Sequence, residues 1–152
     1  MRKEGIGEVA PPTNGDLPFV LDTWRKSYRQ SRLVRDVPNR LYSAIHSKQA
    51  LNTVNASTTL VCKAPGTDVI ISWICGEPGV LHYAYTKHAY RRYGLCHWLL
   101  HLLEQECGEP IRWISFDPWG SWKKRYIRDK GWKRNIYLGL AHLVEYDPGQ
   151  DI

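Results

Sequence analysis

Apolar positions in the first third of the chain follow a helical spacing. From residue 17 to about residue 32, aromatic and aliphatic side chains recur three and four positions apart, and Pro18 stands in the first turn, where a helix tolerates proline best. A second pattern of this kind starts at Pro38 and continues to about Asn52. The sequence therefore predicts two amphipathic helices, each with one face for a core.

After Ser57 the pattern changes to short runs of β-branched and apolar residues. Residues 58–63 and 69–75 flank a Pro-Gly-Thr-Asp turn sequence, which predicts an antiparallel hairpin. The elements expected downstream are a strand at 80–86, a helix at 92–107 ended by Gly108, a strand at 111–116, a helix at 119–130 and a strand at 136–146.

The element order ααβββαβαβ predicts an α/β fold of the α+β kind. Its sheet should be mixed and mainly antiparallel, with helices flanking it. At 152 residues the chain fits one domain with a single core. We place that domain at 17–147, between a flexible lead-in with several Gly and Pro residues at 1–16 and a short tail at 148–152.

Charge and cysteine content narrow the possible functions. The chain carries 21 Lys and Arg against 15 Asp and Glu, a net charge of +6, which favours nucleic acid or a phosphorylated cofactor as partner. The four cysteines form no CxxC pair and stand in or beside apolar runs, so we expect reduced, buried thiols. No apolar stretch approaches the roughly 20 residues of a membrane helix, and the first residues do not resemble a signal peptide, so we expect a cytoplasmic protein.

The connection between the strand at 80–86 and the helix after it carries the clearest chemical signal. The first N–H groups of a helix lack intrahelical acceptors and the helix dipole adds positive potential, so a strand–turn–helix junction favours anions. Here Gly94 lets a phosphate approach the backbone, and Arg91 and Arg92 add positive charge beside it. This predicts a site for a pyrophosphate.

The segment from Tyr85 to Cys96 resembles motif A of the GCN5-related N-acetyltransferases, the GNAT superfamily, written Arg/Gln-x-x-Gly-x-Gly/Ala. Arg91 fills the first position and Gly94 the glycine, whereas Cys96 replaces the usual Gly or Ala. The element order is similar to that of the family, and residues 130–132 resemble a Gly-Phe segment after its fourth helix. The resemblance implies acetyl-CoA as co-substrate, bound by Tyr85, Thr86, Arg91, Arg92, Tyr93, Gly94, Leu95 and Cys96.

The resemblance also implies N-acetyl transfer in a gap between the motif strand and the next strand. The lips of this gap would be residues 83–86 and 114–117, and a backbone N–H near Tyr85 or Thr86 would meet the developing oxyanion. In the family the first two helices border the acceptor side. The first predicted helix and the residues after it are basic, which would favour an acidic or phosphate-bearing acceptor, through Arg25, Lys26, Arg29, Arg32 and Arg35.

Acid–base candidates lie on the two strands that flank this gap and on the helix after them. The candidates for the base are His82, Tyr83 and Tyr85 on the motif strand and Asp117 after the next strand. His82 has the most suitable intrinsic pKa. Many family members protonate the thiolate with a tyrosine four residues before the Gly of Gly-Phe, but Ile127 stands there, and Tyr126, one residue off, becomes the candidate.

A metal site is one further possibility that the sequence raises. His97 and His101 lie four apart on one helix, but no further ligand pattern accompanies them, so we expect no metal.

Two other functions remain open. The densest basic run, at 123–134, is interleaved with aromatic residues; it is either an amphipathic helix or a nucleic-acid site formed by Lys123, Lys124, Arg125 and Arg128. A nucleic-acid site would suit a phage-encoded relative that modifies DNA. The other function is a CoA-binding module without catalysis.

Overall fold

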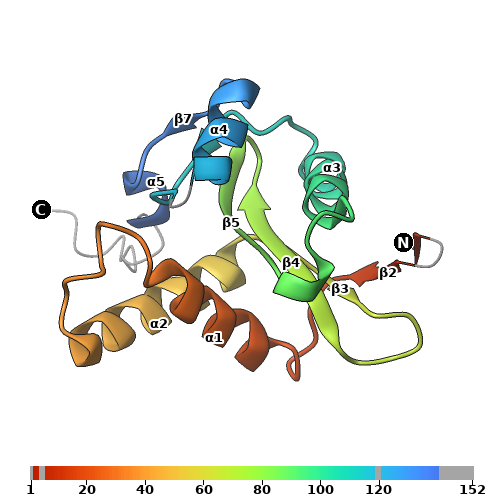
Figure 1. Ribbon diagram of the computed structural model, residues 1–152, viewed down its shortest axis with the longest axis horizontal. Coiled ribbons are helices and arrows are strands. Elements are labelled where there is room, and N and C mark those ends of the chain that lie inside the picture. Colours follow the sequence, from red (N-terminus) through yellow and green to blue (C-terminus); the bar gives the residue numbers. More distant parts are fainter. Residues whose placement is uncertain (1, 4–5, 119–120, 141–152) are drawn as a thin grey trace, which may run out of the picture.

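The computed structural model describes residues 2–3, 6–118 and 121–140, which fold around one sheet (Figure 1). Its strands lie in chain order: β1 (Arg2–Lys3), β2 (Gly7–Ala10), β3 (Thr58–Lys63), β4 (Ile70–Glu77), β5 (Val80–Thr86), β6 (Trp113–Ile114) and β7 (Lys133–Arg134). Neighbours from β1 to β5 are antiparallel, whereas β5–β6 and β6–β7 are parallel. The expected fold class, a mixed and mainly antiparallel sheet with flanking helices, is confirmed.

Helices cover both faces of the sheet. They are α1 (Leu17–Tyr28), α2 (Asn39–Ala56), the 3-10 helix η1 (His88–Tyr90), α3 (Leu95–Cys107), α4 (Ser121–Lys130) and α5 (Tyr137–Leu140). Figure 1 shows α1 and α2 together on one side of the sheet and α3 on the other. In the described part of the chain no helix combines the length and apolarity needed to cross a membrane.

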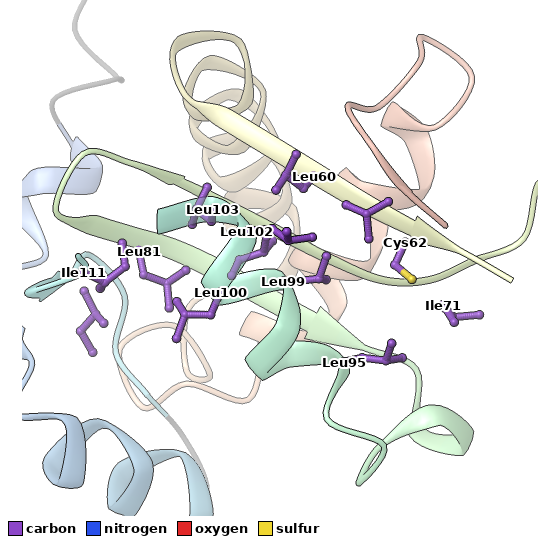
Figure 2. Packing of buried hydrophobic residues seen from close by; sticks show 13 residues of the cluster. Leu60, Cys62, Ile71, Leu81, Leu95, Leu99, Leu100, Leu102, Leu103 and Ile111 are labelled. Atoms are coloured by element: carbon purple, nitrogen blue, oxygen red, sulfur yellow. The ribbon is translucent and has the colours of Figure 1, made fainter. Parts of the chain in front are cut away.

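Two apolar clusters fill the space between sheet and helices. The first, the α3 layer, joins five leucines of α3 to side chains of β3, β4 and β5, as Figure 2 shows. The second, the helix-pair layer, lies under α1 and α2 and is largely aromatic: the rings of Trp24 and Tyr83 stack at 5.4 Å between centroids, and Trp73 packs beside both. The leucines of α3 recur at helical spacing, so the amphipathic pattern in the sequence explains this layer.

The N-terminal segment contradicts the expectation of a flexible lead-in at 1–16. Residues 7–10 form β2, which pairs with β3, and Val9 is buried in the α3 layer. A Cβ on Gly7 would lie 2.6 Å from the Cys62 sulfur and 2.8 Å from the Lys63 carbonyl oxygen. Glycine therefore lets β2 approach β3 closely, and the same glycine made the segment resemble a loop in the sequence.

Boundaries differ most in the C-terminal third. The strand expected at 111–116 is reduced to two residues, because β6 leaves its neighbour soon after it begins. The strand expected at 136–146 is wrong at its start, where 137–140 form α5: Asn135 Oδ1 accepts the Tyr137 N–H at 3.1 Å and starts a turn. The remainder of that expected strand, and the expected tail, lie outside the described residues.

Candidate functional site

The parallel strands β5 and β6 pair only where they begin. In the described residues, the final backbone hydrogen bond between them runs from the Ser115 N–H to the Leu81 carbonyl, at 3.1 Å. Beyond it β5 continues to Thr86 alongside β4. The rings of Tyr83 and Phe116 meet edge-on at 5.3 Å between centroids where the strands have parted. Two parted strands are what the resemblance to the GNAT motif implied at this position.

The turn between β5 and α3 is held from the strand side. Arg91 Nε donates to the Thr86 carbonyl at 3.0 Å, and Gly94, at φ 75°, directly precedes α3. The Trp98 N–H bonds to the Gly94 carbonyl at 3.0 Å, so the N–H groups of residues 95–97 precede the first intrahelical bond. A Cβ on Gly94 would meet nothing within 4 Å, so the backbone angle, rather than crowding, favours glycine.

Positive charge surrounds this turn. Arg91, Arg92 and Tyr93 are all exposed, and Arg92 has φ 72°, a left-handed conformation that side-chain-bearing residues rarely adopt. Such conformations cluster at ligand-binding turns, where the surrounding structure maintains them. The turn therefore combines two exposed guanidinium-bearing side chains with the start of a helix, and both features favour an anion.

Lys123, in the first turn of α4, reaches back to the motif strand. Its Nζ lies 5.6 Å from the centroid of the Tyr83 ring. Burial, and then the charge of Arg91, lower the pKa of Lys123 to about 8, while Cys96 acts in the opposite direction. Lys123 thus belongs to the site around the turn, unlike the other members of the expected nucleic-acid surface, which are exposed: Lys124, Arg125 and Arg128.

A β-bulge sets the direction of His82. Cys75 pairs with Tyr83 and Gly76 with Leu81, so one residue of β5 has no counterpart on β4. As a result, Leu81 packs in the α3 layer whereas Tyr83 packs in the helix-pair layer. The additional residue is His82, which is only 1% exposed and bonds across to the residue after β6.

His82 joins the ends of two strands through both ring nitrogens. Nδ1 lies 2.7 Å from Ser115 Oγ, and Nε2 lies 3.0 Å from Glu77 Oε2. An ionised carboxylate can only accept, so Nε2 carries the hydrogen and Nδ1 accepts from the Ser115 hydroxyl. Ser57 Oγ, at 3.4 Å, donates to the same carboxylate oxygen. We call Glu77, His82 and Ser115 the triad.

A small cavity of about 30 Å³ lies beside the triad on the side of α1 and α2. His82 and Ser115 border it from the sheet, and Tyr28 and His46 from the helices. His46 Nδ1 is buried and has no hydrogen-bond partner within the described residues. Burial, with a contribution from Arg25, lowers the pKa of His46 to about 4, so this ring is neutral near pH 7. The space is large enough for a water molecule.

Asp117, a candidate for the base, is buried and already engaged. Its carboxylate accepts from Ser31 Oγ at 3.1 Å and pairs with the Arg134 guanidinium, and its backbone N–H donates to the Tyr28 hydroxyl at 3.2 Å. These contacts tie the segment after α1, the end of β6 and β7 together. A carboxylate so occupied fits a positioning role better than proton transfer.

Tyr85 and Tyr126 are held by aromatic packing. The Tyr85 ring lies 6.3 Å from that of Trp73 in the helix-pair layer. The Tyr126 hydroxyl lies 3.4 Å from His97 Nδ1 on α3, and its ring meets Trp132 edge-on at 5.7 Å. Burial, then the charges of Cys96 and Glu104, raise the pKa of Tyr126.

The basic run at 123–134 comprises most of α4, the turn after it and β7. Tyr126 and Trp132 are partly buried and pack against the α3 layer, which favours an amphipathic helix over a surface on which bases stack. Trp119 lies outside the described residues. Among the described residues no group of three or more His, Cys, Asp or Glu side chains is arranged to hold a metal ion.

Two members of the triad were not among the candidates that the sequence suggested. His82 was named, but Glu77 and Ser115 were not. The sequence places Glu77 in a turn and Ser115 near the end of an expected strand, within the lip at 114–117, with no acid–base motif around either. Only the bulge, which a regular alternation does not reveal, lets His82 reach both.

The similarity of this chain to known proteins comes from its three-dimensional structure. No protein-family model matches the chain, and no curated protein matches it. Among solved structures, the chain is similar to a possible acetyltransferase from Clostridium difficile 630, at 12% identity and a TM-score of 0.54, with 84% of this chain and 91% of that chain covered.

Two further solved structures show the same likeness. Aminoglycoside N-acetyltransferase AAC(6')-Iy in complex with CoA has 13% identity and a TM-score of 0.51, covering 87% of this chain and 91% of its own. Ribosomal-protein-alanine N-acetyltransferase from Brucella melitensis biovar Abortus 2308 has 14% identity and a TM-score of 0.50, covering 82% and 89%. Identities this low establish a common fold, and the chemistry has to be argued from the residues of this chain.

Proposed function

We propose, on the premise that the chain has the fold of the GCN5-related N-acetyltransferases, that it binds acetyl-CoA and transfers the acetyl group to an amine. One observation carries the proposal. The Gly94 turn lies between β5 and the start of α3, and β5 is the strand that parts from its parallel neighbour β6. A turn suited to an anion therefore lies beside the place where two strands of the sheet separate. A phosphorylated carrier with a long thin arm fits this combination.

The turn would hold the pyrophosphate of the cofactor. Its contacts would come from helix N–H groups and from the guanidinium groups, within the set Arg91, Arg92, Tyr93, Gly94, Leu95 and Cys96. The backbone of Tyr85 and Thr86 would border the pantetheine arm. Burial raises the pKa of the Cys96 thiol, so this side chain is a small neutral group in the position that family members fill with Gly or Ala.

The triad supplies the proton acceptor. Glu77 fixes the His82 tautomer and would stabilise the imidazolium that forms when His82 accepts a proton. A backbone N–H near Tyr85 or Thr86 would meet the oxyanion. The positive charge of Lys123 would stabilise the thiolate that leaves, since the Tyr126 hydroxyl is directed to His97.

The acceptor would reach the triad from the side of α1 and α2, where the cavity lies. The basic residues of α1 favour an acidic acceptor less than the sequence suggested, because several of them are already engaged within the chain. Arg25 and Lys26 pair with Asp22, and Arg29 donates to the Val34 carbonyl at 2.6 Å. We therefore propose a primary amine as the class of acceptor, without an accompanying acidic group.

Calorimetric titration with acetyl-CoA tests the cofactor site through matched glycine variants. Gly94 and Gly66 have φ of 75° and 69°, and a Cβ at either meets nothing within 4 Å, so valine should strain both equally. Gly66 lies in the β3–β4 turn, outside the segment 85–96 that is assigned to the cofactor. We expect Gly94→Val to weaken acetyl-CoA binding about tenfold or more, roughly the value of one lost charge-assisted contact, and Gly66→Val to bind as wild type does.

Two results would contradict the proposal. One is a wild-type chain that does not bind acetyl-CoA, and the other is equal binding by both glycine variants. Mass spectrometry of protein, metabolites and DNA after expression, compared with an Arg91→Ala, Gly94→Val double variant, then identifies the acceptor. Acetyl-CoA binding without thiol release toward any amine would leave a binding module in place of an enzyme.

A further inference from the structure

The strand β3 has an open edge over its first three residues. β4 pairs with β3 along its whole length, whereas β2 pairs with it only from Val61 onward. β2 ends at Ala10, and the next two residues are Pro11 and Pro12, which have no N–H to give to a ladder. Within the described residues, the backbone of 58–60 therefore has no strand on that side.

A groove of about 260 Å³ is lined by residues 57–60 and so runs beside this open edge. Val54 of α2 borders it on one side of the sheet and Glu106 of α3 on the other, since the two helices cover opposite faces (Figure 1). Pockets that enclose small molecules usually measure about 300–1,000 Å³. The smaller volume favours an occupant that also bonds to the strand. We call this space the edge groove.

Successive residues of β3 direct their side chains to opposite faces of the sheet. Leu60 packs in the α3 layer, whereas Thr59 pairs with Cys75, which packs in the helix-pair layer. A strand added at the open edge would alternate in the same way. One of its side chains would point toward the apolar Val54 and the next toward the carboxylate of Glu106.

Negative charge gathers at the α3 side of the edge groove. Glu106 is exposed, and no Lys or Arg is among the described residues that line the groove. Burial raises the pKa of the Cys107 thiol, the Thr58 hydroxyl acts in the opposite direction, and three carboxylates raise it further: Glu106, Glu77 and Glu109. A basic side chain is therefore favoured in the position that faces Glu106.

We propose that the edge groove binds an extended peptide segment of another protein, which pairs with residues 58–60 as an added strand. The segment carries an apolar residue toward Val54 and a Lys or Arg toward Glu106. Such recognition gains affinity from backbone hydrogen bonds and selectivity from alternate side chains. A second copy of this chain fits less well, because edge-to-edge pairing would bring two like charges at Glu106 together. Peptide binding here is independent of the acyl transfer proposed above.

A synthetic peptide with the sequence Thr-Val-Lys-Val-Lys-Thr, blocked at both ends and labelled with fluorescein, tests the proposal. Fluorescence anisotropy with the full chain, at about 0.15 M salt to screen distant charges, should show saturable binding with a Kd below about 1 mM. The peptide Thr-Val-Glu-Val-Glu-Thr, which reverses the charge, should bind about tenfold more weakly or not at all.

Matched variants of the chain test the role of Glu106. Glu106→Lys should weaken binding of the basic peptide about fivefold or more, because an exposed ion pair becomes a repulsion. Glu109→Lys changes the net charge equally. Its side chain is exposed, bonds to Arg112 and does not line the groove, so binding should stay within about twofold of wild type.

Two N-methylated peptides test the strand geometry. In an added strand only alternate N–H groups point to the edge of the sheet. Methylation of the first Lys nitrogen and methylation of the Val nitrogen after it should therefore differ, with one peptide binding about tenfold more weakly than the other.

Three results would overturn the inference. They are a wild-type chain that does not bind the basic peptide, equal losses in the Glu106 and Glu109 variants, and equal binding by the two methylated peptides. Sedimentation velocity tests the other occupant. A dimer of the chain that the peptide dissociates would assign the edge groove to a second copy and would also overturn the inference.

Discussion

The ammonium group of Lys123 lies over the ring of Tyr83, 5.6 Å from its centroid, so one cation of the basic run faces the motif strand. Its neighbour Lys124 is exposed. We expect Lys123→Met to lower kcat for acetyl transfer about tenfold or more, because a developing thiolate loses a nearby charge. Lys124→Met is the matched control and should retain the wild-type kcat; equal losses in both variants would assign the effect to net charge.

The depressed pKa of Lys123 also predicts a pH dependence of stability. The pKa of Lys123 is about 8 in the folded chain against an ordinary value of 10.5, so the unfolded chain binds more protons between these values. The free energy of unfolding therefore gains a contribution that rises with pH through this window. Urea titrations of wild type and Lys123→Met should show a variant advantage near pH 7 that has disappeared above about pH 10. A constant difference across the window would refute the assignment.

His46 should make the fold sensitive to acid. Its pKa falls from 6.5 to about 4 on folding, so between these values the unfolded chain binds the proton and stability decreases as the pH falls. The groups around the ring are Trp24, Tyr28 and Tyr42, together with the charge of Arg25. His46→Gln should flatten the stability profile between pH 6.5 and 4, measured by urea titration, whatever its effect at neutral pH.

The close approach of β2 to β3 at Gly7 predicts that the N-terminal strand contributes to the stability of the fold. Gly7→Ala places a Cβ against Cys62 and the backbone of Lys63, and overpacking of this kind costs about 1–3 kcal/mol in the free energy of unfolding. Gly15→Ala is the control, since its Cβ would meet only Thr13 Oγ1, at 3.7 Å. Thermal unfolding of the two variants should therefore differ, and equal midpoints would mean that β2 contributes little.

Asp117 should act through position and not through proton transfer. Asp117→Asn weakens the pairing with the half-exposed Arg134 and should lower stability by about 1–3 kcal/mol. The pH profile of kcat should keep the apparent pKa of the wild type, because the base is assigned to His82. A variant that folds as stably as wild type but has lost the acidic limb of the profile, where the base becomes protonated, would transfer the role of base to Asp117.

The sequence predicted what depends on local chemistry. The turn at Gly94 and the left-handed cap at Gly108 follow from single residues, and the structure has both at φ near 75°. The strands at 58–63 and 80–86 have the predicted bounds, because each is a run of residues that favour extended backbone. These features need no knowledge of distant contacts.

Features that depend on distant pairing were not predictable in this way. β2 is a short strand that exists because Gly7 fits beside Cys62, which is far away in the sequence. The contact between His82 and Ser115 spans 33 residues and requires the bulge. Lys123 was grouped with a surface charge run, since the sequence does not reveal which face of α4 meets Tyr83. Tertiary context decided all three.

The bulge at His82 also sets how β5 can tolerate a change in length. It lets odd-numbered residues lie on one face of the sheet at Leu81 and on the opposite face at Tyr83, so it acts as a phase shift. Deleting His82 would restore regular alternation with Leu81, Tyr83 and Ala84 in their present layers, but it would remove the side chain that joins Glu77 to Ser115. A relative that lacks the bulge should therefore keep both apolar layers and lose the triad.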